Sequence, residues 1–238
     1  MFSWLSRFKK PTASVAEMLG KADEKVIRVE VKEFAPGIVP FLSLNALTEL
    51  YLYEAATQAV LGAESLAAKS ALADIAGASL AKHKRFAAEL KRRGHQVDIE
   101  MNHYMPRFAQ YTDRIQVDDW HQHVLTVLLV GGMLEDFMAS LASGLKDSFR
   151  KEAAEILSDH SSQQDLHVLL AAEIMADPRV ADKLALWGRR LVGDTLLLAQ
   201  DILKLSENRQ FVWEEMEPIF TEITSDHMRR MDSLGLTA

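Results

Sequence analysis

The chain has 238 residues, which is enough for one large domain whose core folds unaided. It has no cysteine, which excludes disulfides, thiolate metal sites and cysteine nucleophiles and is compatible with a reducing, cytoplasmic location. The net charge of −7 gives nucleic-acid binding no general support, and the low counts of glycine (11) and proline (6) favour long helices.

Residues 1–40 differ in pattern from the rest of the chain. The first ten residues mix aromatic and basic side chains, without a continuous apolar run or a cleavage site, so they indicate a short docking arm and no signal peptide. Residues 24–34 partly alternate in hydrophobicity and are followed by Pro36-Gly37 and Pro40, which predicts an extended segment. We therefore expect an N-terminal arm at residues 1–40 and a helical domain at residues 41–238.

Long stretches without proline divide the helical domain into its predicted elements. Gly62, Gly94 and Gly144 mark helix ends, Asp118-Asp119 marks a helix start, and Asp177-Pro178 separates two helices. The predicted helices span residues 43–61, 65–93, 118–142, 148–176, 180–205 and 211–234. Two hairpins joined by a long crossover are typical of ferritin-like bundles. The sequence thus predicts an all-α, ferritin-like four-helix bundle at residues 41–177 with two additional C-terminal helices at residues 178–238.

The longest run without charged residues lies in the third predicted helix. It spans roughly residues 120–134 and contains two histidines and two glycines. Because a spanning helix needs ~20 apolar residues, we expect a core helix here and no membrane span.

Polar side chains interrupt the predicted core-facing stripe of each of the first four helices. Steps of three and four residues define these stripes. The polar residues on them are Glu54, Gln58, Ser79, His83, Asp136, Ser140, His160, Gln164 and His167. Lys82, Lys84 and Arg85 are expected to point outward. Since buried polar groups are costly unless they are hydrogen-bonded, paired or bound to metal, the stripes predict a shared polar network or a metal site.

Several short motifs in the C-terminal half are distinctive. They are residues 177–179 (DPR), 184–193 (LALWGRRLVG), 199–200 (AQ), 227 (H), 229–231 (RRM) and 234–236 (LGL), with 119–120 (DW) and 136–137 (DF) before them. The chain resembles, through these motifs, the ferritin-like tRNA-(2-methylthio-isopentenyl-adenosine) hydroxylase (MiaE-like) family. The resemblance covers roughly residues 41–238, and its motifs are most specific in the fifth helix.

The resemblance implies an oxidoreductase in which two irons activate dioxygen to hydroxylate a modified adenosine of tRNA. Members of this family carry a glutamate on the first and third helices, and a glutamate with a histidine three residues later on the second and fourth. The four acidic positions fall here on Gln58, Ser79 or Leu80, Ser140 and Gln164. The histidine positions fall on His83 and His167, which retain the family's residue type.

Three interpretations follow from these departures. In the first, the chain is a non-catalytic bundle without iron that serves as a binding or scaffold protein, with a homodimer through exposed helix faces as one arrangement. In the second, a remodelled site holds iron or another metal. Its candidate ligands are Glu54, His83, Asp136 (or Glu135), His160 and His167. In the third, the chain is an ordinary di-iron hydroxylase in which the ligands align at other positions.

Overall fold

The computed structural model describes residues 30–206 and 210–236, which form helices and no strand. The predicted all-α fold class is confirmed. The described elements are η2 (Val31–Phe34), α2 (Ile38–Gly62), α3 (Leu66–Arg92), α4 (Val97–Asn102), α5 (Met105–Arg114), α6 (Trp120–Thr126), η3 (Val127–Gly131), α7 (Gly132–Ser143), α8 (Arg150–Leu157), α9 (Ser161–Ala176), α10 (Pro178–Leu203) and α11 (Trp213–Ser233).

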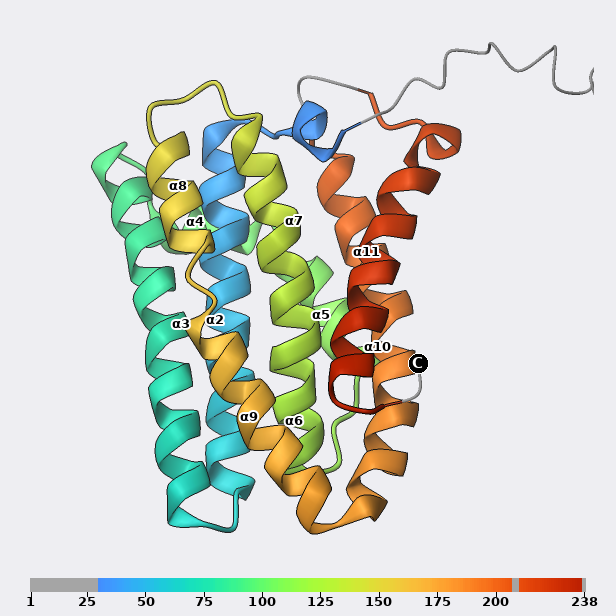
Figure 1. Ribbon diagram of the computed structural model, residues 1–238. Coiled ribbons are helices and arrows are strands. Elements are labelled where there is room, and N and C mark those ends of the chain that lie inside the picture. The colour runs from blue at the N-terminus through green and yellow to red at the C-terminus, as the bar shows by residue number, and fades with distance from the viewer. Residues whose placement is uncertain (1–29, 207–209, 237–238) are drawn as a thin grey trace, which may run out of the picture.

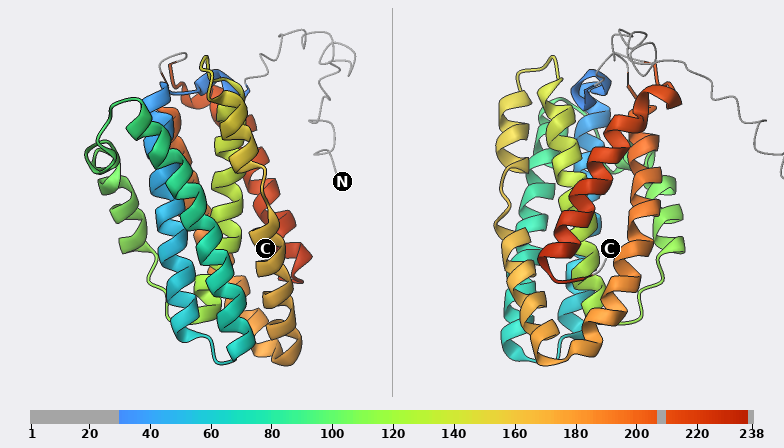
Figure 2. Two further views of the ribbon diagram at one scale, coloured as in Figure 1. Left: turned by 90° about the vertical axis from the view of Figure 1, so that its left-hand side faces the viewer. Right: turned by 45° about the vertical axis from the view of Figure 1, so that its right-hand side comes forward.

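Four helical columns form the bundle (Figure 1). α2 and α3 make the first hairpin. α6, the π-helical segment η3 and α7 run on as one continuous helix, residues 120–143, which is called the central helix below. α8 and α9 together supply the fourth column. α10 and α11 pack against the central helix on the side away from α3, as the two views in Figure 2 also show.

Local signals fix several helix ends as the sequence predicts. The Ser65 hydroxyl accepts a hydrogen bond from the Ala68 N–H at 3.0 Å, and the Asp119 carboxylate accepts one from the Gln122 N–H at 2.9 Å. Both are N-cap contacts, which satisfy donors that the first helical turn leaves free. Gly94 follows α3 with φ of 85°, a left-handed conformation that glycine adopts without strain.

Other predicted boundaries are wrong. α2 begins at Ile38 and not at Ser43, because Pro40 lies in the first turn, where its missing N–H costs nothing. Residues 31–34 form a 3₁₀ turn and are not extended, whereas residues 24–29 lie outside the described residues. The predicted fourth helix is broken at residues 158–160 into α8 and α9, and the crossover contains two short helices, α4 and α5.

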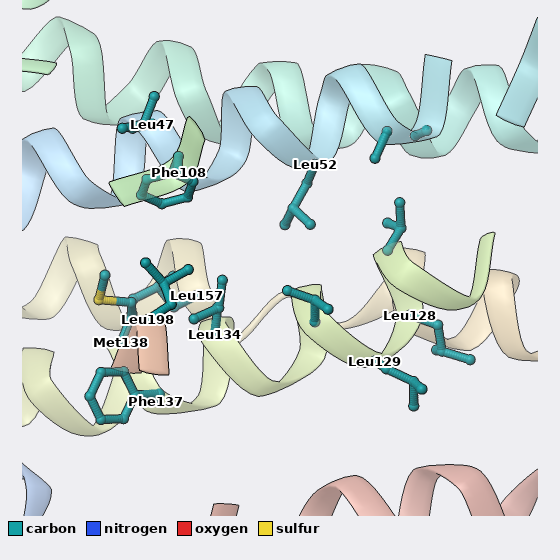
Figure 3. Close-up of a cluster of buried hydrophobic side chains, with 14 of the residues drawn as sticks. Leu47, Leu52, Phe108, Leu128, Leu129, Leu134, Phe137, Met138, Leu157 and Leu198 are labelled. Carbon is teal, nitrogen blue, oxygen red and sulfur yellow. The ribbon is translucent and has the colours of Figure 1, made fainter. Parts of the chain in front are cut away.

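The central helix is long and apolar, and it lies in the core of the bundle. Figure 3 shows Leu52 pointing from α2 toward the helix that carries Leu128 and Leu134. The central helix is also the one described helix that is long and apolar enough to cross a membrane, and 83% of its most apolar window is buried inside the protein. Its apolar character is therefore accounted for by its place in the core.

α10 joins the bundle through the motif that the sequence singles out. Trp187 is buried, and its indole Nε1–H donates to the Thr126 hydroxyl of the central helix at 3.0 Å. Trp187 thus packs this helix onto the bundle. Gly188 lies beside it, and a Cβ at this position would come within 2.7 Å of the Met231 side chain of α11. This glycine lets α10 and α11 approach closely.

Candidate functional site

Each column of the bundle sends one polar side chain toward the same central region. Glu49 of α2, Lys82 of α3 and Glu135 of α7 are buried, with 1%, 7% and 4% of their surfaces exposed. Gln163 of α9, which is partly buried, completes the group. We call these four residues the central cluster. Buried charges of this kind persist in proteins when they are paired and hydrogen-bonded.

The Lys82 ammonium group is the centre of this cluster. Its Nζ donates to Glu135 Oε1 at 2.6 Å and to the backbone carbonyl oxygen of Asp159 at 2.9 Å. The Asp159 carbonyl is available because α8 has ended and α9 has not yet begun at this point. The break in the fourth column therefore supplies a hydrogen-bond acceptor for the buried ammonium group.

Gln163 connects the cluster to the π-helical segment of the central helix. In the orientation that satisfies both ends of its amide, Gln163 donates to the Leu128 carbonyl at 2.9 Å and accepts from the Gly132 N–H at 3.2 Å. In the opposite orientation its nitrogen lies 3.4 Å from Glu135 Oε2. Gly131 lacks a Cβ that would stand 3.2 Å from this amide. A π turn often marks a functional region, and here it gives Gln163 access to the backbone.

The charges of the cluster constrain its protonation. Burial raises the pKa of the Glu49 carboxyl well above its usual value, and the nearby Glu135 charge raises it further. Burial also raises the pKa of Glu135, although Lys82 acts against this effect. Burial alone would lower the pKa of Lys82, but Glu135 and Glu49 outweigh it and raise the pKa. One lysine thus faces two carboxyls, so a neutral cluster keeps Lys82 and Glu135 charged and Glu49 protonated.

The cluster fits a bound metal ion poorly. Glu49 Oε2 has no hydrogen-bond partner among the described atoms, as suits a neutral carboxyl group more than a carboxylate. The Lys82 ammonium stands against the one carboxylate of the cluster and repels a second cation. Within residues 30–206 and 210–236, three or more histidine, aspartate or glutamate side chains nowhere gather closely enough to hold a metal. The cluster is therefore suited to pairing the buried Lys82 ammonium group with a buried carboxylate, and not to binding a metal ion.

The structure does not gather the five residues that the sequence proposes as metal ligands. Glu54 is exposed on α2, and His83 is half-buried with its Nδ1 atom 2.7 Å from the Ala46 carbonyl oxygen. His160 is exposed and its Nε2 lies 4.0 Å from Asp136 Oδ1, so these two residues are neighbours. His167 Nε2 lies 3.1 Å from the Ser233 hydroxyl oxygen of α11. Of the five, only Asp136 and His160 are in contact.

The predicted inward positions on the central helix and the fourth column are wrong by one residue. Asp136 is only partly buried and Ser140 is exposed, whereas Phe137 and Leu141 are buried. A π turn holds one residue more than an α turn, so it moves the inward face by one position. On α9 the buried positions are Leu166 and Leu170, with Gln163 a turn earlier, whereas His160 and Gln164 are exposed. The break at residues 158–160 interrupts the helical count there.

On α2 and α3 the departures have a different origin. Glu54 and Gln58 are exposed, whereas the small side chains of Ala55, Ala56 and Ala59 are the buried ones in this part of α2. On α3 the predicted core-facing position Ser79 is buried, as expected. Lys82, however, is also buried and does not point outward. A run of basic residues is usually a solvated face, so the sequence alone gave Lys82 no distinguishing feature.

Sequence reasoning therefore missed Glu49, Lys82 and Gln163 as members of the cluster and named Glu135 only as an alternative to Asp136. A signal for Glu49 does exist. It is the one charged residue between Phe34 and Glu54, within a segment that is otherwise rich in leucine and alanine. A glutamate in such a segment favours a buried, compensated carboxyl group.

This arrangement of helical hairpins around a central polar cluster defines the ferritin-like class of helical bundles. Residues 32–214 match the family model described as ferritin-like domain, actinomycetes. The chain belongs to this family. No curated protein matches the sequence.

Proposed function

We propose that the chain is a non-catalytic ferritin-like bundle, a cytoplasmic binding or scaffold protein, in which the Lys82–Glu135 ion pair replaces a di-metal centre. Di-iron bundles of this fold place one glutamate on each of two helices and a Glu-x-x-His pair on each of the other two. Glu49 and Glu135 occupy such single positions on α2 and α7. The two positions of the Glu-x-x-His pair then correspond to Ser79 and Lys82 on α3, and to Gln163 and Leu166 on α9.

The buried lysine is the observation that carries this proposal. A di-iron centre needs several anionic oxygen ligands, which bridge the metals and stabilise their higher oxidation states. Lys82 brings a positive charge to within 2.6 Å of Glu135 instead. The positions that would supply the remaining ligands hold a hydroxyl, an amide and an alkyl side chain. The MiaE-like resemblance is then one of ancestry, with the family's chemistry lost.

The metal content of the protein tests this proposal. We expect full-length protein from iron-supplemented cells to contain far less than one iron per chain and to give the same helical circular dichroism before and after treatment with a chelator. Lys82→Met is the matched variant, because it removes the ammonium and leaves the other cluster residues. Two irons per chain in the unmodified protein would overturn the proposal.

The alternative function is a metal-dependent hydroxylase that acts on modified tRNA. The contact between Asp136 and His160 favours it, since a carboxylate and an imidazole are common metal ligands. Glu54, His83 and His167 would have to move toward this pair to complete a remodelled site. If iron is found, His160→Ala should remove it under this alternative, whereas Lys82→Met should leave it in place.

A further inference from the structure

α10 and α11 enclose an apolar groove on the outer side of the bundle, away from the central cluster. The groove has a volume of about 810 Å³. Its walls include Leu196 and Leu197 of α10 and Phe220, Thr224 and Met228 of α11. Leu197 and Met228 are 48% and 46% exposed and line the same hollow, and apolar residues that are exposed together often mark an interaction site. The groove thus offers a contiguous apolar surface to an incoming segment.

The groove continues to the point where the described chain begins. A second hollow, of about 780 Å³, is lined by Glu30, Val31 and Lys32 and shares Glu217 and Thr221 with the first. Figure 1 shows η2 at the end of the bundle where α11 begins. The described part of the chain therefore begins beside this groove.

The segment that precedes Glu30 has the composition to fill it. Residues 1–8 place apolar side chains at Phe2, Leu5 and Phe8, with Trp4 between them, which is the spacing of one helical face. A second set of apolar side chains, spaced by three and four residues from the first of them, follows at residues 15, 18 and 19. The lining of the groove runs over 12 positions of α11, from Glu217 to Met228, or ~17 Å at 1.5 Å per residue. The 29 residues before Glu30 are long enough to return along this distance.

Charge complementarity favours the same occupant. Residues 1–29 contain six lysines and arginines against three acidic residues, although the whole chain has a net charge of −7. Glu217 and Glu222 are exposed along the two hollows. Opposite charges around an apolar contact fix its orientation and favour the matching partner.

We propose that residues 1–29 fold back into the α10–α11 groove, with the apolar side chains of residues 2–8 against Leu197, Phe220 and Met228. The arm then covers this apolar groove and competes for it with any external partner. This inference is independent of metal binding, because the groove and the central cluster share no residue.

Disulfide trapping in the full-length chain tests the proposal directly. Because the sequence contains no cysteine, an introduced pair has no competing thiol. Leu5→Cys combined with Met228→Cys should give an intramolecular disulfide under mild oxidation of dilute protein. Leu5→Cys with Leu61→Cys is the control, since Leu61 is 70% exposed at the far end of α2. We expect the disulfide to form at least about tenfold faster in the first pair. A segment that is docked beside its partner cysteine has a higher effective concentration there than a segment that is only connected to it through the chain.

A second substitution separates specific docking from random collision. Leu197→Glu in the Leu5/Met228 cysteine background should slow trapping about tenfold, because it places a charge in the apolar contact. Leu186→Glu is the matched control, as Leu186 is also an exposed leucine of α10 but lies outside the groove. Three outcomes would each overturn the proposal. The first is equal trapping rates for the Leu5/Met228 and Leu5/Leu61 cysteine pairs, and the second is an equal effect of Leu197→Glu and Leu186→Glu on trapping. The third is the formation of disulfides only between two chains.

Discussion

The indole Nε1–H of Trp187 donates to the Thr126 hydroxyl group, and that hydroxyl donates in turn to the Gln122 carbonyl at 2.7 Å. This chain of two hydrogen bonds joins α10 to the central helix one residue before its π-helical segment begins. Trp187 and Thr126 are both buried, so water cannot replace either partner. The contact orients the C-terminal helix pair on the bundle.

Removal of either partner should cost stability. We expect Trp187→Phe and Thr126→Val each to lower the free energy of unfolding by about 1–3 kcal/mol, because each leaves a buried polar group unpaired or a cavity beside it. The double variant should lose less than the sum of the two, with a coupling energy of about 0.5–3 kcal/mol. Urea unfolding followed by circular dichroism measures all three variants, and strictly additive losses would contradict the hydrogen bond.

The buried ion pair should respond differently to single and double substitution. Lys82→Met leaves the Glu135 carboxylate without its counter-charge and should cost about 3–5 kcal/mol, whereas Lys82→Met with Glu135→Leu should recover most of that loss. The exposed neighbour Lys84 provides the control, since Lys84→Met should change stability by no more than about 0.5 kcal/mol. A double variant as unstable as Lys82→Met would show that the pair contributes more than charge compensation.

Stability should depend on pH through Glu49. Its pKa is raised in the folded protein above the ordinary value of 4.5, so the folded state holds a proton that the unfolded state releases. This contribution is fully present below pH 4.5 and is lost as the pH rises through the folded-state pKa. Glu49→Gln removes the titrating group. We expect the variant to gain stability relative to the unmodified protein as the pH is raised from 4.5 to 8. Urea titrations at each pH would contradict this if the difference stayed constant.

Two glycines should respond to alanine with opposite signs. A Cβ at Gly144 would lie 1.8 Å from the Lys32 carbonyl oxygen, so Gly144→Ala must displace η2 from the end of α7 and lower stability. Gly193 lies within α10 with open space around its Cα, so Gly193→Ala should raise stability by about 0.5–1 kcal/mol through its better helix propensity. The melting temperatures of the two variants relative to the unmodified protein provide the measurement.

The sequence predicts the helices well because caps and breakers are local. Asp119, Gly94 and Asp177 act within one or two turns, and each lies where the sequence indicates a helix end. The central cluster could not be predicted in the same way. The inward positions of the central helix and of the fourth column depend on the one-residue shift in η3 and on the break before Ser161, and neither has a clear local signal. A shift of one position in a helix turns a side chain by about 100°, which is why the predicted stripe contains Asp136 and Ser140 where the structure buries Phe137 and Leu141.

The Lys82–Glu135 pair also has a consequence for biogenesis. Bundles whose core charge is balanced by a bound ion depend for their folding on the supply of that ion and on its delivery. Here the positive charge that balances Glu135 is part of the polypeptide and is present as soon as α3 has been synthesised. Under the proposed function, the interior of this protein is therefore expected to assemble at the same rate in iron-starved and iron-replete cells.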